Sequence, residues 1–155
     1  ANTYGGATTV AGGTLKIGES GALPTGTEVV MAGGTLDLGT HDFAEFGVGT
    51  MTLGGGTVVN DAGSLVLPAN LKVAVGSGAP TVFAGASVFP SGATVTVSDP
   101  ESIPPDVNRY VFATFVGGVS GPMPTVVGLG GDWSVKMRGD TMVLSRNRGA
   151  ILILR

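Results

Sequence analysis

A repeated segment is the feature that most restricts what this chain can fold into. Residues 11–18 (AGGTLKIG) return almost unchanged as residues 32–39 (AGGTLDLG), 21 positions later. A third and shorter copy, residues 55–59 (GGTVV), follows 22 positions after the second. A fixed period of this length is typical of solenoids and arrays, in which each repeat stacks on the next.

The pattern inside the repeats indicates strands. Apolar and polar residues alternate with period two, and glycines interrupt them every few positions, which excludes the helical solenoids. Related segments begin at Thr50, Thr57 and Ser64, at a spacing of seven positions. Three strand-plus-turn units of this length make one coil. We predict an all-β fold, a single-stranded parallel β-helix (β-solenoid) with about 21 residues per coil and three faces.

The alternation also predicts which side chains point inward. Aliphatic side chains from successive coils, about 4.8 Å apart, would form ladders along the axis and contribute about 2 kcal/mol each. The predicted inward set is Leu15, Ile17, Leu36, Leu38, Leu65, Leu67, Leu71, Val73, Val75, Val95 and Val97. The predicted outward set is Thr14, Lys16, Thr35, Asp37, Lys72, Thr94 and Thr96, with Lys16 and Asp37 as neighbours on consecutive coils.

Length and composition favour a single domain. The chain has 155 residues and 43% hydrophobic residues, enough for one continuous core. We expect residues 1–155 to form one β-solenoid domain, with regular coils over 1–98, a Pro-rich loop over 99–108 and terminal coils over 109–155. The absence of cysteine excludes disulfides and thiolate metal sites. No apolar run approaches the roughly 18 residues of a membrane helix, so we do not expect the chain to span a membrane.

Several motifs resemble a known family. Residues 2–10 (NTYGGATTV) form a distinctive opening, and residues 13–18 (GTLKIG), 21–24 (GALP) and 33–38 (GGTLDL) follow it. Together they resemble the autotransporter-associated β-strand repeat over about residues 2–75, and residues 110–155 look like the segment that closes such arrays. The resemblance implies a right-handed β-helix, export to the bacterial cell surface or beyond, and adhesive or structural duty. It carries over no catalytic residues.

Candidate chemistry is sparse. His41, Asp42 and Glu45 could ligate a metal, but Phe43 and Phe46 lie between and beside them, so we favour a solvated corner loop. β-Helix enzymes that act on polysaccharides are the main enzymatic alternative, because this fold can line up acids and bases across coils.

The period generates no such carboxylate pair. It places Val58 or Val59 one coil beyond Asp37, and it places Gly49 one coil beyond Glu28. We therefore predict a protein that is not an enzyme and that uses no cofactor, metal or catalytic residue.

Two groups of residues are candidates for binding. Tyr110, Phe112 and Trp133 would form an aromatic platform for a surface glycan. The tail Ile151, Leu152, Ile153 and Leu154 is apolar on both faces of a strand, which makes it a candidate for self-association.

Charge gives a further indication of assembly. Residues 1–107 carry two bases and nine acids, whereas residues 108–155 carry six bases and two acids. The bases lack the interleaved aromatic residues of a nucleic-acid groove, so we expect no nucleic-acid partner. An acidic start, a basic finish and no obvious cap favour head-to-tail stacking. The predicted function is that of a non-enzymatic, extracellular, structural passenger-like β-solenoid that stacks into surface fibres or layers. The alternative is an adhesin or carbohydrate-binding module.

Overall fold

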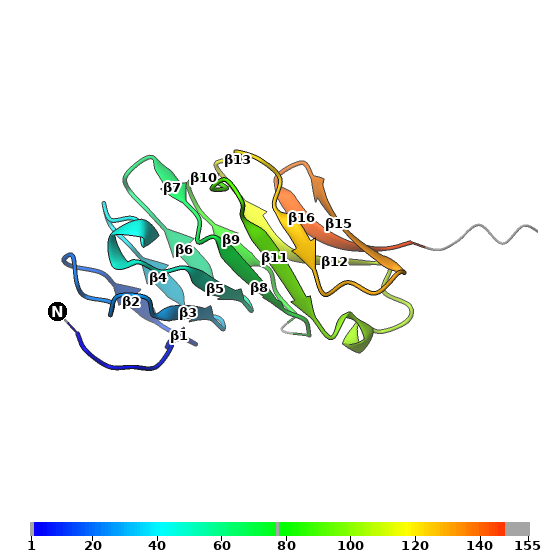
Figure 1. Cartoon of the computed structure of the whole chain (residues 1–155), viewed down its shortest axis with the longest axis horizontal. Helices are drawn as coiled ribbons and strands as arrows, with labels where there is room; N and C mark the ends of the chain where they lie inside the picture. Colours follow the sequence, from blue (N-terminus) through cyan, green and yellow to red (C-terminus); the bar gives the residue numbers. More distant parts are fainter. Residues whose placement is uncertain (1, 77, 148–155) are drawn as a thin grey trace, which may run out of the picture.

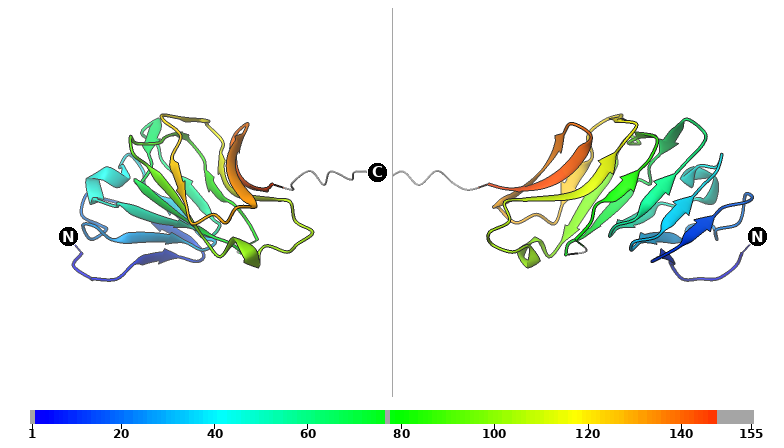
Figure 2. Two further views of the ribbon diagram at one scale, coloured as in Figure 1. Left: turned by 45° about the vertical axis from the view of Figure 1, so that its right-hand side comes forward. Right: turned by 180° about the vertical axis from the view of Figure 1, so that it is seen from behind.

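The computed structural model describes residues 2–76 and 78–147, and in them the chain forms a β-solenoid of three sheets with about 22 residues per turn. Its coils stack along the long axis of the molecule, with the N-terminal coil at one end and a hairpin at the other (Figures 1 and 2). The predicted three-faced parallel β-solenoid is confirmed. No helix in the described part of the chain is long and apolar enough to cross a membrane.

The three sheets are named A, B and C. Sheet A contains, in order, β1 (Thr8–Val10), β3 (Glu28–Met31), β5 (Thr50–Leu53), β8 (Asn70–Ala74), β11 (Thr94–Ser98) and β14 (Thr125–Val127). Sheet B contains β2 (Thr14–Lys16), β4 (Thr35–Asp37), β6 (Thr57–Val59), β9 (Thr81–Phe83), β12 (Arg109–Phe115), β16 (Thr141–Arg146) and β15 (Trp133–Arg138). Sheet C contains β7 (Ser64–Val66), β10 (Ala86–Val88) and β13 (Val119–Ser120).

The coils lengthen along the chain. In the first coils the register follows the predicted period, with Thr8 beside Val29, and β5, β6 and β7 then occupy the three sheets in turn. Farther on, Thr81 lies beside Ala113, so the coil between them is much longer. The increase arises because the Pro-rich segment, with the 3₁₀ turn η2 (Pro100–Ser102), projects as a loop between β11 and β12.

The core is a column of stacked apolar rows. In sheet B one row consists of Leu15, Leu36, Val58, Phe83 and Phe115, and its last four members are at most 1% exposed. All of these belong to one continuous cluster except Leu15, which is 36% exposed.

The prediction that these inward-pointing side chains are buried is therefore wrong for two residues, Leu15 and Val75. Leu15 shares the register of Leu36, but no coil covers it from below because β2 is the first strand of its sheet. Val75 follows the end of β8 and is only half-buried. The other members of the predicted inward set are buried.

Paired glycines form the corner between sheets A and B. A Cβ on Gly34 would lie 2.8 Å from Val10 Cγ1 and 2.9 Å from the backbone nitrogen of Gly12. A Cβ on Gly56, whose φ is +80°, would lie 2.3 Å from the carbonyl oxygen of Gly34. Coils stack so closely at this corner that only hydrogen fits at Gly34 and Gly56, which explains these glycines of the second and third repeats.

The C-terminal part departs from the expected terminal coils. β16 pairs in antiparallel fashion with β12 on one side and with β15 on the other, whereas we expected further parallel strands. The two-residue connection Gly139–Asp140, with φ +57° at Gly139, reverses the chain as type II′ hairpins do. The hairpin buries Met142 and Leu144 in the core cluster. This end of the solenoid therefore carries an antiparallel hairpin, which the sequence interpretation did not predict.

Candidate functional surfaces

The N-terminal end exposes the edges of two strands. Within the described residues β1 pairs only with β3, and β2 pairs only with β4, so each strand has one unpaired side. Tyr4 and Leu15, at this end, are 44% and 36% exposed. Unpaired strand edges invite pairing with another chain unless charge, bulges or a cover prevent it.

The opposite end is stepped. Sheet A ends at β14, sheet C ends at β13, and sheet B continues to β15. Val116, Met123 and Val127 are the large exposed apolar residues of this region. Of the described large apolar side chains that are exposed, only Val66 lies outside the two end regions.

The candidate self-association residues Ile151, Leu152, Ile153 and Leu154 lie outside the described residues. Their role therefore stays a prediction.

The candidate aromatic platform is not displayed on the surface. Phe112 is 2% exposed and Trp133 is 4% exposed, and both pack in the core cluster because β12 and β15 turn them toward the column. Tyr110 is half-buried and donates a hydrogen bond to the carbonyl oxygen of Ala74 at 3.4 Å. It borders a cavity of about 410 Å³ whose walls, including Ile103, are mostly apolar. These aromatic rings offer no exposed stacking face of the kind a sugar needs.

Trp133 and Arg146 hold the hairpin to the Pro-rich loop. The guanidinium carbon of Arg146 lies 4.5 Å from the centre of the Trp133 ring, and its Nη1 donates a hydrogen bond to the carbonyl oxygen of Pro105 at 2.8 Å. Such a cation–π contact contributes about 0.5–2 kcal/mol. The aromatic and basic residues of this region thus stabilise the hairpin.

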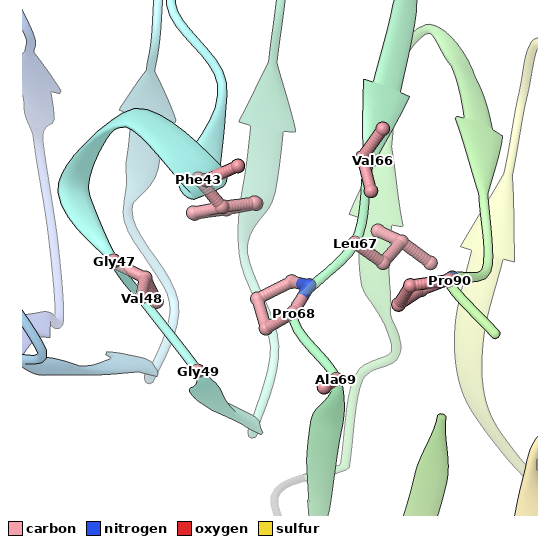
Figure 3. A pocket seen from close by; sticks show the side chains of 10 residues that line it. Phe43, Gly47, Val48, Gly49, Val66, Leu67, Pro68, Ala69 and Pro90 are labelled. Atoms are coloured by element: carbon pink, nitrogen blue, oxygen red, sulfur yellow. The ribbon is translucent and has the colours of Figure 1, made fainter. Parts of the chain in front are cut away.

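An apolar groove runs along the corner between sheets C and A (Figure 3). It has a volume of about 320 Å³, and Phe43, Val66, Leu67, Pro68 and Pro90 are among the residues that line it. Phe43, Pro68 and Pro90 come from three successive coils, and Val66 lies in the same coil as Pro68. The groove is shallow and offers few polar groups that could orient a small ligand.

The outward charges pair across coils. Lys16 Nζ lies 3.5 Å from Asp37 Oδ2, as predicted. Asp37 faces Val59 on the next coil, also as predicted. Such exposed pairs contribute less than about 1 kcal/mol.

Glu28 has a different neighbour from the one expected. It lies beside Thr50 rather than Gly49, because the coil here is slightly longer than the predicted period. Glu28 accepts hydrogen bonds from Thr52 Oγ1 at 2.7 Å and from Lys72 Nζ at 3.1 Å. The bond from Thr52, followed by that from Lys72, holds the pKa of Glu28 below its usual value. These contacts satisfy the carboxylate and pair it with no second acid.

The segment around His41 is a short 3₁₀ turn rather than a solvated loop. η1 (Phe43–Phe46) fills the third face of the second coil and buries both phenylalanines at 1% exposure. Asp42 caps the turn, and its Oδ2 also accepts a hydrogen bond from the backbone N–H of Val66. Glu45 completes the capping box.

The carboxylates of Asp42 and Glu45 accept hydrogen bonds from backbone N–H groups, and Glu45 also bonds to His41. His41 Nδ1 lies 2.9 Å from Glu45 Oε2, and this hydrogen bond lowers the pKa of Glu45. Within residues 2–76 and 78–147 no three His, Cys, Asp or Glu side chains gather as a metal ion would require.

Comparison with protein-family models, with curated proteins and with solved structures finds no match to this chain. The likeness to autotransporter repeats therefore rests on the motifs of residues 2–75, and what is established is the β-solenoid fold.

Proposed function

We propose that this chain is a non-enzymatic structural β-solenoid that acts outside the cell or at the bacterial cell surface. The observation that carries the proposal is the distribution of exposed apolar side chains. Apart from Val66, those in the described residues lie at the two ends of the column, where strand edges are also unpaired. A column whose large exposed apolar side chains lie mainly at its ends suits end-to-end association.

The passenger-like role and the location come from the sequence resemblance. A column of stacked coils is a rigid spacer, and its stability comes from contacts between neighbouring coils. The polar contacts along its sides support this role, because Lys16 with Asp37 and Lys72 with Glu28 tie adjacent or nearby coils together. Self-association through the ends would lengthen such a spacer. Head-to-tail stacking into fibres or layers is the simplest form of that association.

Sedimentation velocity and light scattering over a wide concentration range test the proposal. We expect the mean mass to rise with concentration, and electron microscopy to show particles elongated along one axis. A strictly monomeric chain at the highest concentration would overturn the self-association part of the proposal.

Glycan arrays and turnover assays on acidic polysaccharides test the other classes. A specific glycan ligand would favour the adhesin alternative, and turnover would favour an enzyme. We expect neither.

A further inference from the structure

Asp99, which directly follows β11 (Figure 1), has a backbone conformation that its neighbour opposes. Its φ of +55° and ψ of +54° lie in the left-handed region, and within residues 2–76 and 78–147 it is the one residue other than glycine with a positive φ. The next residue is Pro100, and a proline ring favours an extended backbone at the residue before it. Such strain persists only where the surrounding structure enforces it, and it often marks a functional site.

Buried residues hold the chain on both sides of Asp99. Val97, the last inward residue of β11, is 1% exposed, and Pro100 and Ile103 are also buried. Asp99 itself is exposed between these fixed points. The backbone cannot relax by moving the whole loop, so the strain remains at Asp99.

The carbonyl group of the Asp99–Pro100 peptide bond is polarised. Its oxygen accepts two hydrogen bonds from Ser102, one from Oγ at 2.9 Å and one from the backbone N–H at 3.1 Å. Two donors on one carbonyl oxygen are the arrangement of an oxyanion hole, because they stabilise the negative charge that nucleophilic attack places on that oxygen. Ser102 thus prepares the carbonyl carbon of Asp99 for attack.

The Asp99 carboxylate is a nucleophile that belongs to the same residue as this carbon. Asp42 accepts a hydrogen bond from the backbone N–H of Phe43 at the start of η1. Among the described residues Asp99 receives no such bond from η2, since Pro100 has no N–H to donate. The carboxylate therefore stays available, and attack within one residue requires no second reactant to be brought into place.

We propose that the chain cleaves itself at the Asp99–Pro100 bond. A carboxylate oxygen of Asp99 bonds to the carbonyl carbon of its own residue, and the bond from that carbon to the Pro100 nitrogen breaks. The electron pair of the broken bond stays on the nitrogen, which takes a proton from the solvent and leaves as a secondary amine. One water molecule then opens the cyclic anhydride, so that Asp99 ends with two carboxyl groups. The net reaction is the hydrolysis of one peptide bond, in which nothing is oxidised or reduced.

Cleavage here leaves the solenoid in one piece. All three sheets join strands from before the bond to strands from after it: β11 pairs with β14 in sheet A, β9 with β12 in sheet B, and β10 with β13 in sheet C. The two fragments therefore stay interlocked and separate only on denaturation. This self-processing goes beyond the proposed structural function and does not depend on it.

Mass spectrometry of the denatured chain tests the proposal. The purified chain is incubated in mildly acidic buffer, because the leaving nitrogen takes up a proton, and samples are denatured at intervals. We expect two fragments that meet between Asp99 and Pro100, with a summed mass one water above that of the chain. Incubation in concentrated urea gives the rate of an ordinary Asp–Pro bond, and the folded chain should cleave at least about tenfold faster. A folded chain that stays intact, or that cleaves no faster than in urea, would overturn the proposal.

Variants separate the roles of the two residues. Asp99→Gly removes the nucleophile, accommodates the positive φ and should abolish cleavage. Ser102→Ala keeps the Asp–Pro sequence but loses the Oγ hydrogen bond, and it should cleave at least about tenfold more slowly. Ser102→Thr keeps a hydroxyl group and should restore most of the rate.

Ser98→Ala is the matched control, because Ser98 is exposed on the other side of Asp99, and it should cleave like the wild-type chain. Circular dichroism should show all four variants folded, since the three positions are exposed. Ser102→Ala that cleaves as fast as Ser98→Ala, or an Asp99→Gly chain that is still cut, would overturn the proposed mechanism.

Discussion

Two buried hydroxyl groups in the solenoid have opposite hydrogen-bonding states. Ser87 lies between Leu65 and Val119 in the inner row of sheet C, and its Oγ has no hydrogen-bond partner. Thr81, on the inner side of β9, donates to the carbonyl oxygen of Gly55 at 3.1 Å and accepts from the Gly55 backbone N–H at 3.1 Å. The first hydroxyl opposes folding, and the second supports it.

Ser87→Ala should therefore raise the free energy of unfolding by about 1 kcal/mol, because it removes a buried group that has lost its water partners. Thr81→Val, the matched control, should lower it by about 1–3 kcal/mol, because the two polar groups of Gly55 lose their partner. Urea denaturation followed by circular dichroism measures both. Equal losses in the two variants would show that the Ser87 hydroxyl is bonded after all.

At the residue scale, alternation predicted the column well and its ends poorly. Leu36 and Leu38 are buried because coils lie on both sides of them, and a period of two is enough to identify such positions. Leu15 has the same pattern, but its exposure depends on being first in the sheet. The burial of Phe112 and Trp133 likewise depends on the hairpin, which places β16 beside β12 and β15 beside β16. Local pattern does not contain these facts.

At the scale of the element, the Gly-Gly pairs set how closely consecutive coils can stack at the corner between sheets A and B. Gly34→Ala should cost about 1–3 kcal/mol of unfolding free energy, because its Cβ would overlap Val10 and Gly12 of the preceding coil. Gly12→Ala changes the neighbouring glycine of the same corner one coil earlier, where nothing lies within 4 Å, and should change stability by less than about 0.5 kcal/mol. Thermal unfolding of both variants measures the difference. Similar losses would mean that backbone freedom, not coil spacing, selects these glycines.

Two elements were missed although local indications of them exist. Gly139–Asp140 lies between two alternating segments, which is a hairpin pattern, but the expectation of continued parallel coils took precedence over it. Asp42 and Glu45 have the spacing of a capping box, which indicates a helical turn. In both cases a repeat-based interpretation failed where the chain departs from its own period.

At the scale of the molecule, the two ends of the described solenoid differ, because sheet B finishes in an antiparallel hairpin at one of them. Apart from a long side chain such as Lys72, which reaches Glu28 two coils away, each coil contacts its neighbours, so the stability of a coil depends on what lies above and below it. β1 and β2 have neighbours on one side only, whereas β5 and β6 are enclosed on both. At the other end Arg146 bonds to Pro105 and packs on Trp133, which fixes the hairpin.

The rate of amide hydrogen exchange should therefore vary along the axis of the solenoid. In dilute solution we expect the amides of β1 and β2 to exchange fastest and those of β5 and β6 slowest, with the hairpin more protected than the first coil. Arg146→Ala should accelerate exchange in β15 and β16 and leave β1 and β2 unchanged, because the two regions share no contact across the intervening coils. Mass spectrometry of peptic fragments resolves these regions. Uniform exchange along the chain, or an effect of Arg146→Ala on β2, would show that the column unfolds as one unit instead of coil by coil.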